Sequence, residues 1–427
     1  MKRIAFARQP GGSHYYFRAE LPCTASLPPS ANTGFASLQA NFDLTGNNGN
    51  MVIGESVARI FECNRAESCY FDPVALLAAG WSPQRISDAV RERFDLVVLA
   101  MANAVRPDYD PGAFTDFVEA LQTDCVVLGL GKQKAMPVRA GSLRPGMQRL
   151  LRIFEERAKL LGVRGFETEH WLQGIGIGRA RALGCPSMFV YPGNILSLTP
   201  PEPHADGPVV TAGHIHQKSP RTAALLQLLR GVPAHYVMQD EIFHLGSRFA
   251  RWRDFYNDAT GQVDTALAGR IFGEILGADP ALAGYWYFQD VPAWRVFCSR
   301  FRLFVGDRFH GAVAAMQAGV PALIVRDDLR VAELTEFFGI PNLPITELGQ
   351  ARLSEAIAAE LSPECFARFH ATYGQRLAGF LAALRELGIP LAIGEPAAGP
   401  GPQRDPAAKG DGLAGKVGGL LRAWVGR

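Results

Sequence analysis

The sequence lacks the features that mark a secreted, membrane-spanning or nucleic-acid-binding chain. Its seven cysteines are odd in number, scattered, and include no C-x-x-C pair, which argues against a disulfide framework or a zinc cluster. It has no run of about 18 apolar residues, and the basic start Met1–Pro10 has no apolar core of the length that a secretory signal requires. The formal net charge of +2 is too small to indicate a nucleic-acid surface. We therefore predict a soluble, cytoplasmic protein with no nucleic-acid partner, and we expect Cys125 and Cys298 to be buried core thiols.

What the sequence does contain is a series of apolar runs of strand length. In the first half these are residues 95–100, 125–131 and 187–191, separated by longer segments with helical spacing such as 146–161. Continuous apolar runs, as opposed to alternating ones, are typical of strands that are covered on both faces. They predict an α/β fold with parallel sheets flanked by helices.

Residues 199–208 interrupt this pattern with four prolines in ten residues and predict a domain linker. After them the alternation restarts. We predict strands at 208–213, 234–239, 285–288, 303–305 and 322–325, and a helix at 222–230. A chain of 427 residues is long enough for two domains, which we place at 1–200 and 208–389, facing each other across a cleft.

Residues 390–427 are rich in Pro, Gly and Ala and predict a flexible tail. Its last part, 413–427, carries Leu420, Leu421 and Trp424 among basic residues. Two interpretations stay open for this part. It is either an interfacial helix that makes weak contact with a membrane surface, or a frayed end, because its glycines weaken any helix.

Three short motifs resemble known binding motifs, but their sequence context does not support a binding site. Residues 410–417 have the spacing of a phosphate-binding P-loop but end in Val417, where a magnesium-binding Ser or Thr is needed. The glycines of 174–178 follow a predicted helix and not a strand, so they do not form a dinucleotide fingerprint. His214 and His216 share one side of a strand-like segment, but a metal site needs further ligands. We predict no metal.

The most informative segment is 301–321, which predicts a strand, a loop and a helix. An apolar run stops at Gly306, Asp307, Arg308 and His310 follow, and an Ala-rich helical segment begins next. Unpaired N–H groups and the helix dipole make such a helix start suitable for an anion. The alternative is that Arg308 is a surface cation and His310 a helix-cap residue.

Further segments also place polar groups at the carboxyl ends of predicted strands, where ligands gather in open α/β sheets. They are the Gly/Asn loop 45–50 before a helix at 52–61, the strand end 129–133, the strand end 161–168, and residues 326–330. The side chains concerned are Asn47, Asn48, Asn50, Gln133, Arg164 and Arg330.

Taken in order, these segments resemble the polysaccharide pyruvyl transferase family. The likeness rests on G-N-N-G-N, V-V-L-G-L-G-K-Q, V-R-G-x-x-T, G-C-P-S before an apolar run, and D-R-F-H-G…G-V-P followed by D-x-R. It covers about residues 41–345 and is strongest at 305–339.

The resemblance implies two Rossmann-like domains similar to a GT-B glycosyltransferase. It implies transfer of pyruvyl from phosphoenolpyruvate to a sugar of a cell-surface glycan as a ketal, with segment 1–200 on the acceptor side and 208–389 on the donor side. The R-x-H pair of the family falls on Arg308 and His310, and the arginine of its V-R-G segment on Arg164. Twenty residues after the histidine the family usually has lysine, and this chain has Arg330.

Binding of phosphoenolpyruvate and formation of a ketal require cationic side chains and a proton-transfer group. Phosphoenolpyruvate carries a carboxylate and a phosphate, which planar guanidinium groups bind in a bidentate manner. We therefore expect Arg164, Arg308 and Arg330 to bind it together with His310, which is also the general acid/base. No cofactor is expected.

The acceptor is expected to be a sugar or a lipid-linked glycan, bound by Asn47, Asn48, Asn50 and Gln133. A lipid-linked acceptor would bring the cytoplasmic protein to the inner face of the membrane. Two other functions stay open. One is a nucleotide-sugar glycosyltransferase of the GT-B type, which a nucleotide sugar but not phosphoenolpyruvate would protect against heat. The other is a catalytically inactive glycan-binding protein.

Overall fold

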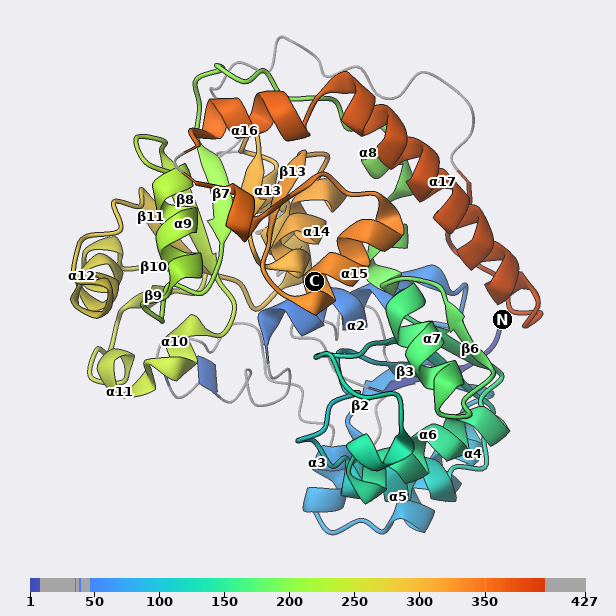
Figure 1. The fold of residues 1–427 in the computed structure, drawn as a ribbon. Coiled ribbons are helices and arrows are strands. Elements are labelled where there is room, and N and C mark those ends of the chain that lie inside the picture. Colours follow the sequence, from blue (N-terminus) through green and yellow to red (C-terminus); the bar gives the residue numbers. More distant parts are fainter. Residues whose placement is uncertain (8–34, 36–37, 40–46, 350, 396–427) are drawn as a thin grey trace. The chain divides into compact units, whose positions relative to one another are not determined.

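The computed structural model describes residues 1–7, 35, 38–39, 47–349 and 351–395. Residues 1–395 form one compact unit that contains two separate sheets (Figure 1). The P-loop-like residues 410–417 and the terminal segment 413–427 lie outside the described residues. None of the helices in the described ranges is long and apolar enough to cross a membrane.

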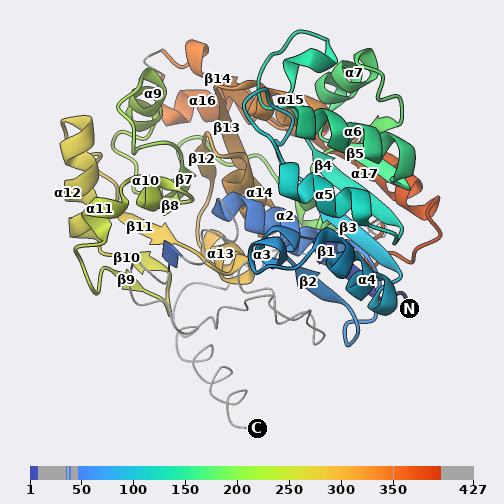
Figure 2. The same cartoon turned by 90° about the horizontal axis from the view of Figure 1, so that it is seen from below.

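The first sheet has six parallel strands in the order β2-β1-β3-β4-β5-β6. Nearly all of its residues are buried, because helices cover both faces (Figure 2), as the continuous apolar runs predict. The predicted strands at 95–100 and 125–131 are confirmed. The strands are β1 Ile4–Ala7, β2 Cys69–Phe71, β3 Leu96–Ala100, β4 Cys125–Leu130, β5 Leu160–Val163 and β6 Ala180–Ala182.

The helices of this half begin where the sequence supplies caps. Asp72 and Ser82 accept hydrogen bonds from the first backbone N–H groups of α3 and α4, and each is followed by proline at the first helical position. The helices are α2 Asn48–Ile60, α3 Pro73–Ala78, α4 Pro83–Arg93, α5 Gly112–Ala120, α6 Pro145–Arg157, α7 Phe166–Gly174 and α8 Pro192–Leu196.

The second sheet has the order β14-β13-β12-β7-β8-β11-β10-β9 and is parallel except for β9 and β10. From β7 the chain passes to β8 and then to β9 at the edge of the sheet. It comes back through β10 to β11 beside β8, and continues to β12 on the other side of β7. The predicted strands of this half are confirmed within about two residues. They are β7 Val209–Ala212, β8 Ala234–Met238, β9 Tyr256–Asn257, β10 Gln262–Val263, β11 Gly284–Tyr287, β12 Phe304–Gly306, β13 Ala322–Arg326 and β14 Asn342–Pro344.

Helices α14 and α15 lie on this sheet (Figure 1), and α14 begins at Phe309, directly after the R-x-H arginine. The predicted fold class, α/β with two mainly parallel sheets, is therefore confirmed. The helices of this half are α9 Pro220–Leu228, α10 Glu241–His244, α11 Gly246–Phe249, α12 Thr265–Leu276, α13 Val291–Cys298, α14 Phe309–Gln317, α15 Leu329–Phe338, α16 Leu353–Glu360 and α17 Pro363–Arg385.

Two predicted strand-like segments are wrong. Residues 187–191 fall in and after a buried 3₁₀ helix, η3, at Pro186–Phe189. Here Phe189 stacks on Phe380 of α17, with ring centroids 4.1 Å apart. A short apolar run shows only that a segment is buried, and Pro186 cannot donate to a strand ladder. Residues 214–216 leave β7 and enter a turn.

Two helices connect the halves of the chain. Helix α2 belongs to the first half but packs against η3, α13 and α14. Helix α17 belongs to the second half but packs against α8, and Tyr373 donates a hydrogen bond to the carbonyl of Met188 (2.8 Å). The two sheets lie within the predicted segments 1–200 and 208–389, but the helices cross that division.

Past α17, the chain returns to the first half. The backbone N–H of Ala392 donates to Ile60 and that of Glu62 to Pro390, so the ordered chain continues beyond the predicted tail start at 390. The thiols of Cys125 and Cys298 are buried as predicted. Burial raises the pKa of Cys125 to about 11, so this thiol stays protonated and unreactive.

Candidate functional site

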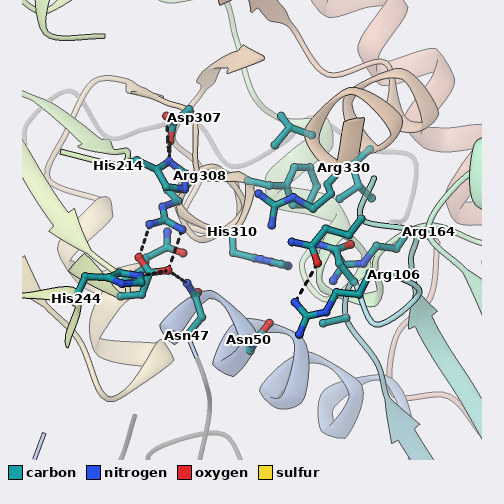
Figure 3. Close-up of a pocket in the computed structure, with 18 of the residues that line it drawn as sticks. Asn47, Asn50, Arg106, Arg164, His214, His244, Asp307, Arg308, His310 and Arg330 are labelled. Atoms are coloured by element: carbon teal, nitrogen blue, oxygen red, sulfur yellow. Dashed lines mark hydrogen bonds and ion pairs between the residues drawn. The ribbon is translucent and has the colours of Figure 1, made fainter. Parts of the chain in front are cut away.

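A pocket of about 440 Å³ lies at the carboxyl ends of strands from both sheets (Figure 3). In the second sheet it lies where the strand order reverses, between the parallel strands β7 and β12, the place where open α/β sheets bind ligands. Of the predicted site residues, all except Asn48 line this pocket: Asn47, Asn50, Gln133, Arg164, Arg308, His310 and Arg330.

Asn48 does not line the pocket, and its predicted place in the acceptor site is not supported by the geometry. Its side chain is buried, donates to the carbonyl of Phe288 and accepts a hydrogen bond from the hydroxyl of Tyr287 (2.8 Å). Its neighbour Asn47 caps α2, accepting from the N–H of Gly49 (2.7 Å) and donating to Asp240 (3.0 Å). The first helical turn thus directs adjacent amides in different directions.

Arg164 brings a buried cation to the pocket. It is only 2% exposed, and it donates from Nε to the carbonyl of Gly129 (2.9 Å) and from Nη1 to Asn103 (2.7 Å). Nη2 is buried and has no hydrogen-bond partner among the described residues. Burial lowers the pKa of Arg164 from its usual value. Gly131 of the G-L-G-K-Q motif leaves space for the Arg164 side chain, because a Cβ at this position would lie only 2.6 Å from Cδ of Arg164.

The V-R-G-x-x-T motif ties Arg164 to the second half of the chain. Glu333 of α15 accepts hydrogen bonds from the N–H (2.6 Å) and hydroxyl (2.9 Å) of Thr168. It packs over Gly165, where a Cβ would lie 2.5 Å from Cγ of Glu333. The same helix α15 carries Arg330 in its first turn, where it donates to Asp328 (2.6 Å). The motif therefore brings two cations from different sheets to one pocket.

Arg106 is a further cation of the pocket that the sequence analysis missed. Its Nη1 donates to Gln133 (3.1 Å), so Gln133 holds an arginine in addition to lining the pocket. Asn103 and Arg106 come after β3, and Gln133 comes after β4. These two strands are neighbours in the first sheet. The strand-end rule that found Gln133 could have found both residues.

Arg308 is not a free cation. Its guanidinium forms ion pairs with Asp240 and with Glu241 (2.8 Å), and Nε donates to the carbonyl of Gly213 (2.9 Å). Both carboxylates follow β8, which lies beside β7. Two acidic groups therefore already balance the charge of Arg308, which is predicted to bind phosphoenolpyruvate.

His310 lies in the first turn of α14, between Arg308 on one side and Arg330, Arg164 and Arg106 on the other (Figure 3). Its Nε2 is 3.6 Å from Sγ of Cys185, which comes from the G-C-P-S motif. Burial, with the charges of Arg164 and Arg330, lowers the pKa of His310 well below its usual value. The ring is therefore neutral in the unliganded pocket.

The remaining wall is formed by three histidines. His214 contacts Asp307, with Nδ1 3.1 Å from Oδ1, and His216 stacks on His244 with ring centroids 4.4 Å apart. The ligand atoms of His216, Asp240 and Glu241 lie within 4.8 Å of one another. Both carboxylates also accept hydrogen bonds from Arg308.

His216 makes the stability of the protein dependent on pH. Burial lowers its pKa from 6.5 to about 4, so the unfolded chain binds its proton more readily than the folded protein. The contribution to stability is full above pH 6.5 and is lost as the pH falls towards 4. Between about pH 7.5 and about pH 5, protonation of His216 should lower the free energy of unfolding of the wild type by on the order of 2 kcal/mol. We expect this decrease to be absent in His216→Gln.

The measurement is the free energy of unfolding in urea at both pH values. His204→Gln is the control, because His204 is exposed and its replacement leaves the pH dependence as in the wild type. Equal pH dependence of His216→Gln and wild type would contradict the prediction.

The model of the polysaccharide pyruvyl transferase family matches residues 47–328. Among solved structures, the chain is similar to a putative UDP-N-acetylglucosamine 2-epimerase from Listeria monocytogenes, at 12% identity over 91% of this chain and 97% of that one, with a TM-score of 0.45. It is also similar to HepE from Anabaena in complex with UDP, at 12% identity over 91% and 99%, with a TM-score of 0.44. The glycosyltransferase SnogD from Streptomyces nogalater is 12% identical over 91% and 99%, with a TM-score of 0.35. No curated protein matches the sequence.

Proposed function

Because this chain belongs to the polysaccharide pyruvyl transferase family, we propose that it transfers the pyruvyl group of phosphoenolpyruvate to a sugar of a cell-surface glycan or its precursor. The product is a pyruvate ketal, and phosphoenolpyruvate is a donor substrate, with no cofactor. The reaction takes place in the cytoplasm, at the inner face of the membrane if the acceptor is lipid-linked.

The observation that carries the proposal is the buried Arg164. Its Nη2 has no hydrogen-bond partner, and it forms no ion pair with a carboxylate, among the described residues. Such a guanidinium is costly in a protein interior unless a ligand supplies the missing negative charge. Arg330 and Arg106 lie on the same side of the pocket (Figure 3). Three guanidinium groups suit a molecule that carries both a carboxylate and a phosphate.

This arrangement revises the part played by Arg308 in the proposal. Two carboxylates, Asp240 and Glu241, already pair with it. Arg330 and Arg106 each pair with one carboxylate, so together with Arg164 they are the better candidates for the donor anion. Arg308 lines the pocket between these carboxylates and His310. In the proposed complex it contacts the donor only through the N–H groups that the carboxylates leave available.

His310 is the proposed proton-transfer group. Phosphoenolpyruvate would neutralise the charges of Arg164 and Arg330, which lower the pKa of His310. Donor binding therefore raises that pKa and allows the ring to take up a proton. The methylene carbon of the donor must be protonated before a hydroxyl adds to its neighbour, and His310 faces the side where the donor would lie.

We expect His310→Gln to lower the rate of phosphate release about 100-fold while phosphoenolpyruvate still binds, because the arginines stay in place. Release of inorganic phosphate would be measured with purified, folded protein. The exposed His204→Gln serves as the matched control. A His310→Gln rate within about twofold of wild type would remove His310 from the chemistry.

The test of the function itself uses a panel of lipid-linked and nucleotide-activated sugars. The proposal expects phosphate release from phosphoenolpyruvate with at least one acceptor, and protection against heat by phosphoenolpyruvate. The rival function, a nucleotide-sugar glycosyltransferase, expects protection by a nucleotide sugar alone. A protein that binds glycans without catalysis would release no phosphate with any acceptor.

A further inference from the structure

His214 and Asp307 form a histidine–carboxylate pair in the wall of the pocket. Nδ1 of His214 lies 3.1 Å from Oδ1 and 3.3 Å from Oδ2 of Asp307. The Asp307 side chain is 1% exposed, while that of His214 is 17% exposed and lines the pocket. The carboxylate is therefore inside the protein and the imidazole is open to a ligand.

The contacts fix which ring nitrogen carries the hydrogen. Arg221 also forms an ion pair with Asp307, and hydrogen bonding and the charges of both neighbours keep the pKa of Asp307 low despite its burial. An ionised carboxylate only accepts hydrogen bonds, so Nδ1 of His214 must donate. Nε2 is then the ring atom left to accept a proton, and it has no hydrogen-bond partner among the described residues.

The sheet holds this pair in place. His214 follows β7 and Asp307 follows β12, and these strands are neighbours, with Ala212 paired to Gly306. The pair therefore lies at the reversal point of the second sheet. In Figure 3 it lies on the side of Arg308, whereas Arg164 and Arg106 lie on the opposite side of His310.

The reaction needs more than one proton-transfer group. Forming the ketal breaks the O–H bonds of two sugar hydroxyls and makes two O–C2 bonds. The bond between C2, the enol carbon of the donor, and the phosphate oxygen breaks. Of the two protons that the hydroxyls release, one is added to C3, the methylene carbon, and the other leaves with phosphate. A group that delivers the C3 proton from the donor side cannot at the same time accept a hydroxyl proton.

We propose that His214, oriented by Asp307, is the base whose Nε2 accepts the proton of the attacking acceptor hydroxyl. His310 then has the separate task of protonating the methylene carbon of the donor. This inference rests on the proposed function. It assigns the acceptor to the part of the pocket with Asp240 and Asn47, whose side chains suit a polyhydroxylated ligand. Both substrates then contact residues of both segments, unlike the expected division into an acceptor side at 1–200 and a donor side at 208–389. Asp307 is a positioning residue, since it acts only through His214.

The other histidines of this wall do not offer the same arrangement. Nε2 of His216 contacts the side-chain amide of Gln217 (2.9 Å), and its ring face is covered by His244. The charged or titratable groups that interact with His214 are Asp307, Asp240 and His216. Arg221, Arg308 and His244 in turn contact these three groups. Of the three histidines, His214 alone is oriented by a buried carboxylate.

The test measures phosphate release across pH with an acceptor identified for the wild type, together with phosphoenolpyruvate affinity by calorimetry. For His214→Gln we expect kcat to fall about 100-fold, while phosphoenolpyruvate affinity stays within about twofold. The wild-type rate should level off as the pH rises, whereas the rate of His214→Gln should keep rising about tenfold per pH unit, because hydroxide then acts as the base. Asp307→Asn should also lower kcat. His204→Gln should leave kcat, the affinity for phosphoenolpyruvate and the pH–rate profile unchanged.

Imidazole rescue gives a second readout. We expect added imidazole to restore part of the activity of His214→Ala, a result that a structural role would not give. An unchanged pH profile, a loss of donor affinity equal to the loss of rate, or an absence of rescue would overturn the inference and leave the proposed function intact. No phosphate release by the wild type with any acceptor would instead overturn the proposed function.

Discussion

Arg164→Met is expected to abolish binding of phosphoenolpyruvate while leaving the unliganded protein at least as stable as the wild type. Among the described residues the buried guanidinium forms no ion pair and its Nη2 has no hydrogen-bond partner, so part of its desolvation cost remains until an anion binds. Methionine fills a similar volume without that cost. Removing one member of a buried charge pair costs about 4 kcal/mol of binding, or roughly a thousandfold in affinity.

The measurement is the melting temperature with and without phosphoenolpyruvate. The wild type should be stabilised by the ligand, and Arg164→Met should not respond to it. Arg139→Met is the matched control, because Arg139 is exposed and lies outside the pocket. A variant that still responds to phosphoenolpyruvate would show that Arg164 does not bind the donor.

Glu55→Gln is expected to produce the largest loss of stability. Glu55 of α2 is buried and accepts two hydrogen bonds from Arg295 of α13, at 2.7 and 3.0 Å. Arg295 also donates to Gln317 of α14 (3.0 Å). Removing the carboxylate leaves a buried guanidinium without its counter-charge, which costs about 3–5 kcal/mol.

Urea unfolding at neutral pH checks this value. The matched control is Asp116→Asn, which breaks the exposed ion pair with Arg149 and should cost less than about 0.5 kcal/mol. The double variant Glu55→Met/Arg295→Met should recover most of the loss, since neither charge is then buried. A cost below about 1 kcal/mol for Glu55→Gln would show that water or other groups replace the carboxylate.

The strand-end rule explains why part of the site could be predicted from the sequence. Arg164, His310 and Arg330 each follow a continuous apolar run closely, and side chains at the carboxyl ends of parallel strands converge whatever the strand order. Asn48 shows the limit of this reasoning. A Gly/Asn loop predicts a helix start, but which amide faces the pocket depends on the phase of the first turn and on Tyr287, which is distant in sequence.

The partners of the site residues could not be predicted, because they depend on strand order. Arg308 meets Asp240 only because β12 and β8 both flank β7. His214 meets Asp307 for the same reason, although they are 93 residues apart. The sequence also did not distinguish a buried 3₁₀ turn from a strand at residues 187–191, since both are short apolar runs.

The packing of α2 limits how this protein can be recombined with its relatives. The proline-rich segment 199–208 looks like a natural crossover point for chimeras, because the two sheets lie on either side of it. A crossover there would take Glu55 from one parent and Arg295 from the other, and would place Asn47 opposite a foreign Asp240. Residues 47–60 should therefore be exchanged together with the second sheet, so that buried charges from one parent remain paired.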